Sequence, residues 1–533
     1  MTSSKAYWIA KLLTRMKKSD IDVISNTPLP HNFRLVEIKG EDWVRVAAHC
    51  EDKKSRLSSL WADEKDGCFV VTACYEKSGA FLMLRAALAL KEPQIASLAH
   101  LYPAASRLER HCRDLLGIHF ENSMDTRRWT RHQAWEEDFY PLRAASSPAK
   151  SSDKLSKVEL TSDQDYEFYS VQGEAVYEIP VGPVHAGIIE PGHFRFQAVG
   201  ELVINLEERL GYTHKGIEKI AVGRDIHQLL RLAGRVSGDT TVAHTWAACQ
   251  AAENAAKIEV PERALFIRAI LSERERVANH LGDIGAICND VGFSFGQMQF
   301  SRLRELWQRT NQSLFGHRLL MDLLIPGGVN VHLDDQACKI ISDETKVLQK
   351  EVHELFSILR NSQSLRGRLV NAGVLSTKSA TNLGCLGVLA RASNVPYDAR
   401  LDVAYPPYDT MSLVRPLQTE GDVSARVVQR AEEIYASIVA IEQLLEKLPH
   451  GPIKTAWSDP PTNAEGLGVI EGWRGEIVTY VRFGEEGKIA RFFPRDPSWF
   501  NWPALEVLIH NNIVPDFPVC NKSVNGSYSG HDL

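Results

Sequence analysis

A glutamate and two histidines lie close together in this sequence, at His185, Glu190 and His193. Carboxylate and imidazole groups exchange protons readily, and burial would move the pKa of such a carboxylate toward neutrality. The three residues therefore predict a site of proton transfer. The alternatives are that Glu190 is a surface or structural carboxylate at a strand end, and that each histidine is a hydrogen-bonded core residue.

Thiolate ligands for a metal are not grouped anywhere in the sequence. No two cysteines have the Cys-x-x-Cys spacing, and no Gly-x-Gly-x-x-Gly fingerprint of a dinucleotide site follows an expected strand. An odd, scattered set of cysteines in a long chain is typical of buried, reduced thiols, not of a disulfide framework or a zinc site. The nine cysteines are at positions 50, 68, 74, 112, 249, 288, 338, 385 and 520.

Length and composition favour a multi-domain cytoplasmic protein. The chain has 533 residues, 44% of them hydrophobic, and a net charge of −6 that argues against a nucleic-acid surface. No apolar segment of a secretory signal follows the first residues. The longest apolar stretch, residues 80–90, is interrupted by Arg85 and is too short to span a bilayer. We therefore expect any membrane association to come through partner subunits.

The elements that would position these residues are both helical and extended. Residues 105–116, 261–281 and 334–359 carry apolar side chains at a helical period, and Pro261 suits a helix start. Stretches rich in strand-forming residues lie at 66–75, 175–180, 194–196 and 472–493. We therefore expect an α+β protein, in which a small N-terminal α/β domain precedes a larger, mainly helical domain with peripheral β-strands.

A small, polar segment interrupted by proline divides the chain. Residues 144–154 read Ala-Ala-Ser-Ser-Pro-Ala-Lys-Ser-Ser-Asp-Lys, which is the composition of a linker. This segment predicts an N-terminal domain at 1–143, a linker at 144–158 and a C-terminal domain at 159–533.

The N-terminal domain resembles the C-type subunit of respiratory complex I. The matching motifs occur in the family's order and are Pro103-Ala104-Ala105, Glu109-Arg110, Asp114-Leu115-Leu116-Gly117-Ile118 and Pro141-Leu142. One departure is His111, where the family usually has an acidic residue. The alternative is an ordinary amphipathic helix that ends in a charged loop, but this alternative does not explain why the other motifs follow in the family's order.

The C-terminal domain resembles the D-type subunit of complex I and, more closely, the large subunit of formate-hydrogenlyase-type (group 4) nickel–iron hydrogenases. The motifs that carry the resemblance are Gly182-Pro183-Val184-His185, Glu190-Pro191-Gly192-His193-Phe194-Arg195-Phe196, His214-Lys215-Gly216-Ile217-Glu218-Lys219, Val260-Pro261-Glu262-Arg263-Ala264, Glu273-Arg274-Glu275-Arg276, Arg391-Ala392-Ser393 and Asn501-Trp502-Pro503. Fusion of the two subunit types is itself typical of that branch of the family.

The resemblance implies two pairs of nickel-binding cysteines, and this chain has neither. The four ligand positions are Ser237, Thr240, Ser527 and Gly530. Hydroxyl groups and a glycine do not replace thiolates, which are the soft ligands that such a centre needs. We therefore expect no metal and no other cofactor in this chain. The sequence also ends at Leu533, about where relatives without a cleavable nickel-maturation tail end.

The resemblance gives the charged residues candidate roles. It places Glu190 where hydrogenases have a proton-passing carboxylate, and Arg391, Asp398 and Arg400 in a motif near the active-site cleft. An internal ion-pair network would explain the last three residues equally well. Quinone binding stays open, although the histidine and tyrosine that hold a quinone in complex I map to Ile189 and to a position at or near Gly238.

Two functions follow from the resemblance. The first is a large subunit of a membrane-associated oxidoreductase complex that couples electron transfer to proton or ion movement. Its implied partners are an iron–sulfur small subunit of the complex I B type, which holds the cluster, and membrane-embedded antiporter-like and H-type subunits. The second is a non-catalytic scaffold between the same partners. Both imply a peripheral position on the cytoplasmic face of the membrane, with no nucleic-acid partner.

Overall fold

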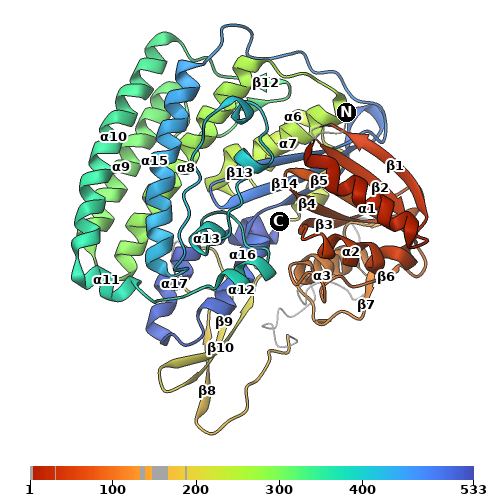
Figure 1. Ribbon diagram of the computed structural model, residues 1–533, viewed down its shortest axis with the longest axis horizontal. Helices are drawn as coiled ribbons and strands as arrows, with labels where there is room; N and C mark the ends of the chain where they lie inside the picture. Colours follow the sequence, from red (N-terminus) through yellow and green to blue (C-terminus); the bar gives the residue numbers. More distant parts are fainter. Residues whose placement is uncertain (1–3, 31, 132–138, 147–165, 187–188) are drawn as a thin grey trace, which may run out of the picture.

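The structure is a computed structural model that describes residues 4–30, 32–131, 139–146, 166–186 and 189–533. A mixed sheet with its helices forms one side of the molecule, and a bundle of long helices forms the other (Figure 1). A three-stranded hairpin sheet and helix α7 (Thr241–Ala256) lie between them. This arrangement is the α+β fold expected from the sequence.

A five-stranded sheet in the order β1-β2-β5-β4-β3 forms the N-terminal region. Strands β2 and β5 are parallel, and the other neighbours are antiparallel. Most side chains of β4 and β5 are buried, as expected of central strands covered on both faces. The elements of this region are α1 (Tyr7–Lys18), β1 (Val23–Leu29), β2 (Phe33–Ile38), α2 (Trp43–Asp52), β3 (Arg56–Lys65), β4 (Cys68–Lys77), β5 (Ala80–Ala89), β6 (Gln94–Ala96), α3 (Ala105–Leu116) and β7 (His119–Glu121).

The C-terminal region begins with an antiparallel sheet in the order β10-β9-β8 and continues into the helical bundle. Helices α8, α9, α10 and α15 pack side by side (Figure 1). The further elements are β8 (Val176–Val181), β9 (His193–Val199), β10 (Leu202–Arg209), α5 (Ile217–Ala221), α6 (Ile226–Ala233), α8 (Glu262–Asp290), α9 (Ser294–Phe315), α10 (Asp335–Asn361), α11 (Gln363–Leu369), α12 (Thr377–Asn382), α13 (Gly387–Ala392), α14 (Ala399–Asp402), α15 (Val423–Glu446), α16 (Ser498–Leu508), α17 (Phe517–Val524) and α18 (Tyr528–Asp532).

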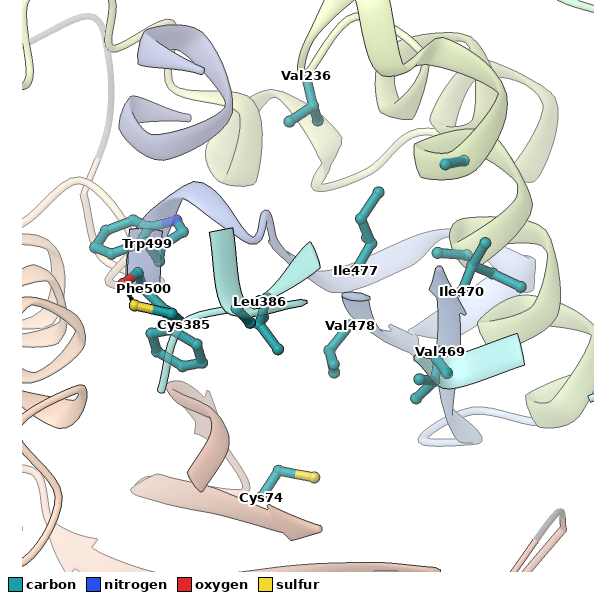
Figure 2. Close-up of a cluster of buried hydrophobic side chains, with 14 of the residues drawn as sticks. Cys74, Val236, Cys385, Leu386, Val469, Ile470, Ile477, Val478, Trp499 and Phe500 are labelled. Atoms are coloured by element: carbon teal, nitrogen blue, oxygen red, sulfur yellow. Dashed lines mark hydrogen bonds between the residues drawn. The ribbon is translucent and has the colours of Figure 1, made fainter. Parts of the chain in front are cut away.

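Helix α7 lies unusually close to the hairpin sheet formed by β13 (Glu465–Gly472), β14 (Gly475–Phe483) and β15 (Ile489–Arg495). A Cβ atom on Gly466 or on Gly468 would lie 2.0 Å from a backbone oxygen of α7. Only glycine permits this approach. Figure 2 shows part of the core beside this hairpin, with Cys385 next to Leu386 and to Trp499 and Phe500 of α16, and with apolar side chains of β13 and β14 farther along the same core.

The N-terminal region is joined to the hairpin sheet by buried ion pairs. The Arg56 guanidinium donates to Glu476, and Arg482 donates to Asp63 over 2.6 Å. Buried apolar side chains of both regions also belong to one continuous core. Residues 147–165, which include most of the expected linker, lie outside the described part of the chain. The domain boundaries at 143 and 159 therefore stay a prediction.

The elements expected from periodicity are confirmed. The 105–116 helix is α3, and the other two expected helices are α8 and α10. Pro261 is the N-cap residue of α8 and Asp334 is that of α10. The apolar stretch at 80–90 contains strand β5, in which Arg85 pairs with Glu465. Within the described ranges, no helix is both long and apolar enough to cross a membrane.

Candidate functional site

Ser237 and Ser527 meet in the folded chain, although 290 positions separate them. Their hydroxyl oxygens lie 2.9 Å apart, and both side chains are buried. Ser237 directly precedes a short 3₁₀ turn and α7, whereas Ser527 is the N-cap of α18 and accepts a hydrogen bond from the Gly530 backbone. The resemblance implies that these two segments share one site, and the structure confirms that they come together.

An ion pair between Asp239 and Arg474 fills the space beside these hydroxyls. Both carboxylate oxygens of Asp239 accept from the Arg474 guanidinium over 2.7 Å, and one of them also accepts from Ser237 over 2.8 Å. Burial opposes ionisation of Asp239, but Arg474 outweighs it and holds the pKa of the carboxyl well below its ordinary value. Since Ser237 donates to Asp239, the Ser527 hydroxyl must donate to Ser237.

The other two positions that the resemblance assigns to nickel ligands, Thr240 and Gly530, also lie against other groups of the protein. The Thr240 hydroxyl donates to Asp239 and accepts from Trp473 and Arg474 over 3.0 Å each. At Gly530, an added Cβ would lie 2.8 Å from the Asp496 carboxylate. A side chain has no room at this position unless Asp496 moves.

Ser237, Asp239, Arg474 and Ser527 border a cavity of about 530 Å³. Most of the residues that line it have polar side chains, and neither cysteine nor histidine is among those described. Hydroxyls already bonded to one another, and a carboxylate already paired with arginine, do not fit a nickel–iron centre. Besides the residues named above, the lining includes Ile189, Glu190, Gly238, Asn279, Gly282, Asp283, Ala286, Asn289, Gln297, Ser301, Arg304, Lys522, Asn525, Gly526, Tyr528 and Ser529.

Glu190 lines this cavity but is exposed in the single chain. Its carboxylate accepts a hydrogen bond of 3.0 Å from the Ser529 backbone, which ties the segment before β9 to the C-terminal segment. The sequence left open a surface carboxylate at this position, and the exposure of Glu190 in the isolated chain agrees with that alternative. Its role in proton transfer stays a prediction.

The two histidines have different surroundings. His185 is half-buried, and its Nε2 lies 3.2 Å from the Tyr528 hydroxyl at the edge of the cavity. His193 is buried in β9, where its ring packs on Phe168 and its Nδ1 lies 3.3 Å from the Gly182 carbonyl. His185 thus contacts a residue of the cavity wall, whereas His193 belongs to the core of the small sheet.

Arg391, Asp398 and Arg400 form a buried ion-pair network outside the residues that line the cavity. Arg391 donates to Glu433 and Glu471 over 2.8 Å each. Arg400 donates to Asp398 over 2.7 Å and to Glu273 over 3.0 Å. Each of these charges has an opposite charge beside it. Because the paired residues come from different elements, the network joins α8, α13, α15 and β13. The geometry favours the structural alternative for these three residues.

Sequence reasoning missed two residues that determine the site, Asp239 and Arg474. A signal for Asp239 was its place between the two replaced ligand positions. A signal for Arg474 was the pair of glycines at 472 and 475, which marks a tight hairpin whose central residues project toward a neighbour. The sequence alone could not pair them, because 235 positions separate the two.

Buried Glu275 was also missed. It lies on α8 below the start of α7, where its carboxylate accepts from the backbone N–H groups of Val242 and Ala243 over 2.7 and 3.2 Å. Burial raises its pKa to about 8, because these bonds compensate only part of the cost of removing the charge from water. The group is therefore protonated near neutral pH.

Three family models match consecutive parts of the chain. The 30 Kd subunit of respiratory-chain NADH dehydrogenase matches residues 36–152. Nickel-dependent hydrogenase matches residues 215–282, and the 49 Kd subunit of respiratory-chain NADH dehydrogenase matches residues 290–465.

Similar proteins extend the match over nearly the whole chain. Formate hydrogenlyase subunit 5 of Escherichia coli (strain K12) is 30% identical over 95% of this chain and 87% of its own length. Hydrogenase-4 component G of the same organism is 32% identical over 88% of this chain and 81% of its own. A chain of the membrane-bound sulfane sulfur reductase, an archaeal respiratory membrane complex, has a TM-score of 0.63 at 26% identity, covering 67% of this chain and 99% of its own.

Proposed function

Because this chain belongs to the family of large subunits that membrane-bound hydrogenases share with respiratory complex I, we propose that it couples electron transfer to proton or ion movement without a nickel–iron centre of its own. The observation that carries the proposal is the Ser237–Ser527 contact. The fold still brings the two ligand segments together, but it joins them by hydroxyl groups. The cavity is retained while its metal chemistry is not.

The proposed partners follow from the family. An iron–sulfur small subunit of the complex I B type would hold the cluster that delivers electrons. Membrane-embedded antiporter-like and H-type subunits would carry the ions, and the large subunit would lie peripherally on the cytoplasmic face. Two similar proteins from membrane assemblies support this arrangement. They are the membrane-bound hydrogenase subunit alpha of Pyrococcus furiosus and the chain of the archaeal respiratory membrane complex.

Glu190 is the proposed proton-carrying group of this site. It lies at the cavity, and its hydrogen bond from Ser529 connects it to the segment that contains Ser527. A quinone remains a candidate occupant, but Ile189 and Gly238 offer it no side-chain hydrogen bonds.

The test is a Glu190→Gln substitution in the purified complex, reconstituted into closed vesicles. Glutamine keeps an oxygen that can accept from Ser529 while it removes the titratable group. We expect proton movement to fall at least tenfold while electron transfer to an artificial acceptor persists. Glu201→Gln, at the exposed turn between β9 and β10, is the matched control and should retain both activities. Unchanged proton movement in the Glu190 variant would favour a purely structural subunit.

A further inference from the structure

Arg304 is a cation of the cavity wall without a partner in the described part of the chain. It projects from α9 and is half-buried. Its Nε is enclosed and has no hydrogen-bond acceptor, and its guanidinium forms no ion pair with the residues described. An enclosed N–H group without an acceptor is costly, so this arginine lacks a group that would complete its bonding.

The position of this guanidinium depends on Gly282 of α8. A Cβ atom added to Gly282 would lie 3.1 Å from Cδ and 3.2 Å from both Cζ and Nε of Arg304. The arginine thus packs against a helix surface that has no side chain at this point. Glycine inside a helix is unfavourable by about 1 kcal/mol relative to alanine. The benefit of Gly282 is therefore the room that it leaves for the Arg304 side chain to pack against α8.

The carboxylates of the cavity do not neutralise Arg304. Asp239 is paired with Arg474, and Asp283 accepts from Arg430 over 2.9 Å. The Glu190 carboxylate accepts from the Ser529 backbone. One guanidinium therefore borders the cavity without a carboxylate bonded to it.

We propose that the cavity binds a small organic carboxylate, which the Arg304 guanidinium holds by paired N–H···O bonds. The planar fork of arginine matches the two oxygens of a carboxylate. A cavity of about 530 Å³ accommodates an organic acid and not only a single ion. The neutral side chains of Asn279, Asn289 and Gln297 can bind the remaining polar groups of the ligand. This inference goes beyond the proposed coupling function and does not depend on it.

The test is isothermal titration of the purified full-length chain with succinate, and with acetate, sulfate and chloride for comparison. We expect saturable binding of succinate and weaker binding of chloride. Charge-assisted hydrogen bonds predict about 10- to 100-fold weaker succinate binding after Arg304→Gln. Gly282→Ala retains the charge but displaces the guanidinium, and should weaken binding in the same direction. Arg302→Gln, an exposed position on the same helix, should bind as the parent does.

Three results would overturn the proposal. One is the absence of saturable succinate binding to the parent chain. The second is an Arg304 variant that binds succinate as tightly as the parent, and the third is sulfate binding at least as tight as succinate binding. If Arg304→Gln does not fold, Arg304→Lys replaces it, because lysine keeps the charge but not the fork, and an unchanged affinity in that variant would equally contradict the assignment.

Discussion

Replacing Arg391 with methionine tests whether the buried charges near the cavity are structural or catalytic. The change removes one cation from the network and leaves the chain length of the side chain nearly unchanged. Glu433 and Glu471 then lose the donor that contacts both of them. All three side chains are essentially inaccessible to water.

The expected loss of stability is large. Removing one partner of a buried ion pair costs about 3–5 kcal/mol, because an uncompensated charge remains. Glu433 keeps hydrogen bonds from His280 and Gln429, which favours the lower end of that range. Burial opposes the charge of Glu433, but Arg391 holds its pKa well below the ordinary value. The stability that this carboxylate contributes is present above its unfolded pKa and is lost as pH falls through the folded pKa. The difference between parent and variant should therefore stay about constant from pH 8 to pH 5 and become smaller only as pH falls below the unfolded pKa of Glu433.

Urea unfolding followed by tryptophan fluorescence measures this difference. Arg309→Met is the control, because Arg309 pairs with Glu305 on the exposed face of α9. This variant should unfold at the same urea concentration as the parent. A catalytic role would give another pattern, in which the Arg391 variant unfolds with the parent but loses activity. That result, or a destabilisation that does not become smaller below the unfolded pKa of Glu433, would refute the structural account.

Three further predictions concern the site and the linker. At pH 5, Glu275→Gln should be about 1 kcal/mol less stable than the parent, because glutamine loses one of the two backbone hydrogen bonds. Burial raises the pKa of Glu275 to about 8, so the parent loses stability as pH rises from the unfolded pKa toward 8, and at pH 8 the variant should be as stable as the parent or more stable. Urea midpoints of parent and variant that differ by the same amount at pH 5 and pH 8 would contradict this prediction. Gly530→Ala should lower the free energy of unfolding by about 1–3 kcal/mol, because the added methyl group would contact Asp496. Gly367→Ala on α11, where an added Cβ meets no neighbouring atom, should leave the stability unchanged, and equal thermal midpoints for the two variants would contradict the prediction. Limited trypsin digestion should cut first within the 144–158 linker, and the two fragments should co-elute, because ion pairs such as Arg482–Asp63 join them; separate elution would contradict this.

The long elements were predictable because each follows from a local pattern. Helix α10 has its buried residues on one stripe at helical spacing, and Asp334 caps its first turn. The apolar run that contains strand β5 was considered only as a membrane span and was not predicted to be a strand. Arg85 interrupts the run, and its ion-pair partner, Glu465, lies 380 positions later, so the sequence could not show the reason for the arginine.

The site was predictable only where the family supplied the alignment. The resemblance brought Ser237 and Ser527 together, and the structure confirms their contact. It could not show that Asp239 and Arg474 would occupy the adjoining space, because such a pair depends on how the β13–β14 hairpin packs on the start of α7. No motif encodes burial directly, and it is the burial of Arg391 and the exposure of Glu190 that favour the structural alternative for the one and the surface alternative for the other.

Metal analysis of the purified complex shows most directly whether this chain lacks a nickel–iron centre. Hydroxyl groups, a glycine and the Asp239–Arg474 ion pair stand where a nickel site would need thiolates. We therefore expect far less than one nickel per large subunit in complex prepared from cells grown with ample nickel, together with iron that is accounted for by iron–sulfur clusters. About one nickel per chain, retained after gel filtration in the presence of a chelator, would contradict this expectation.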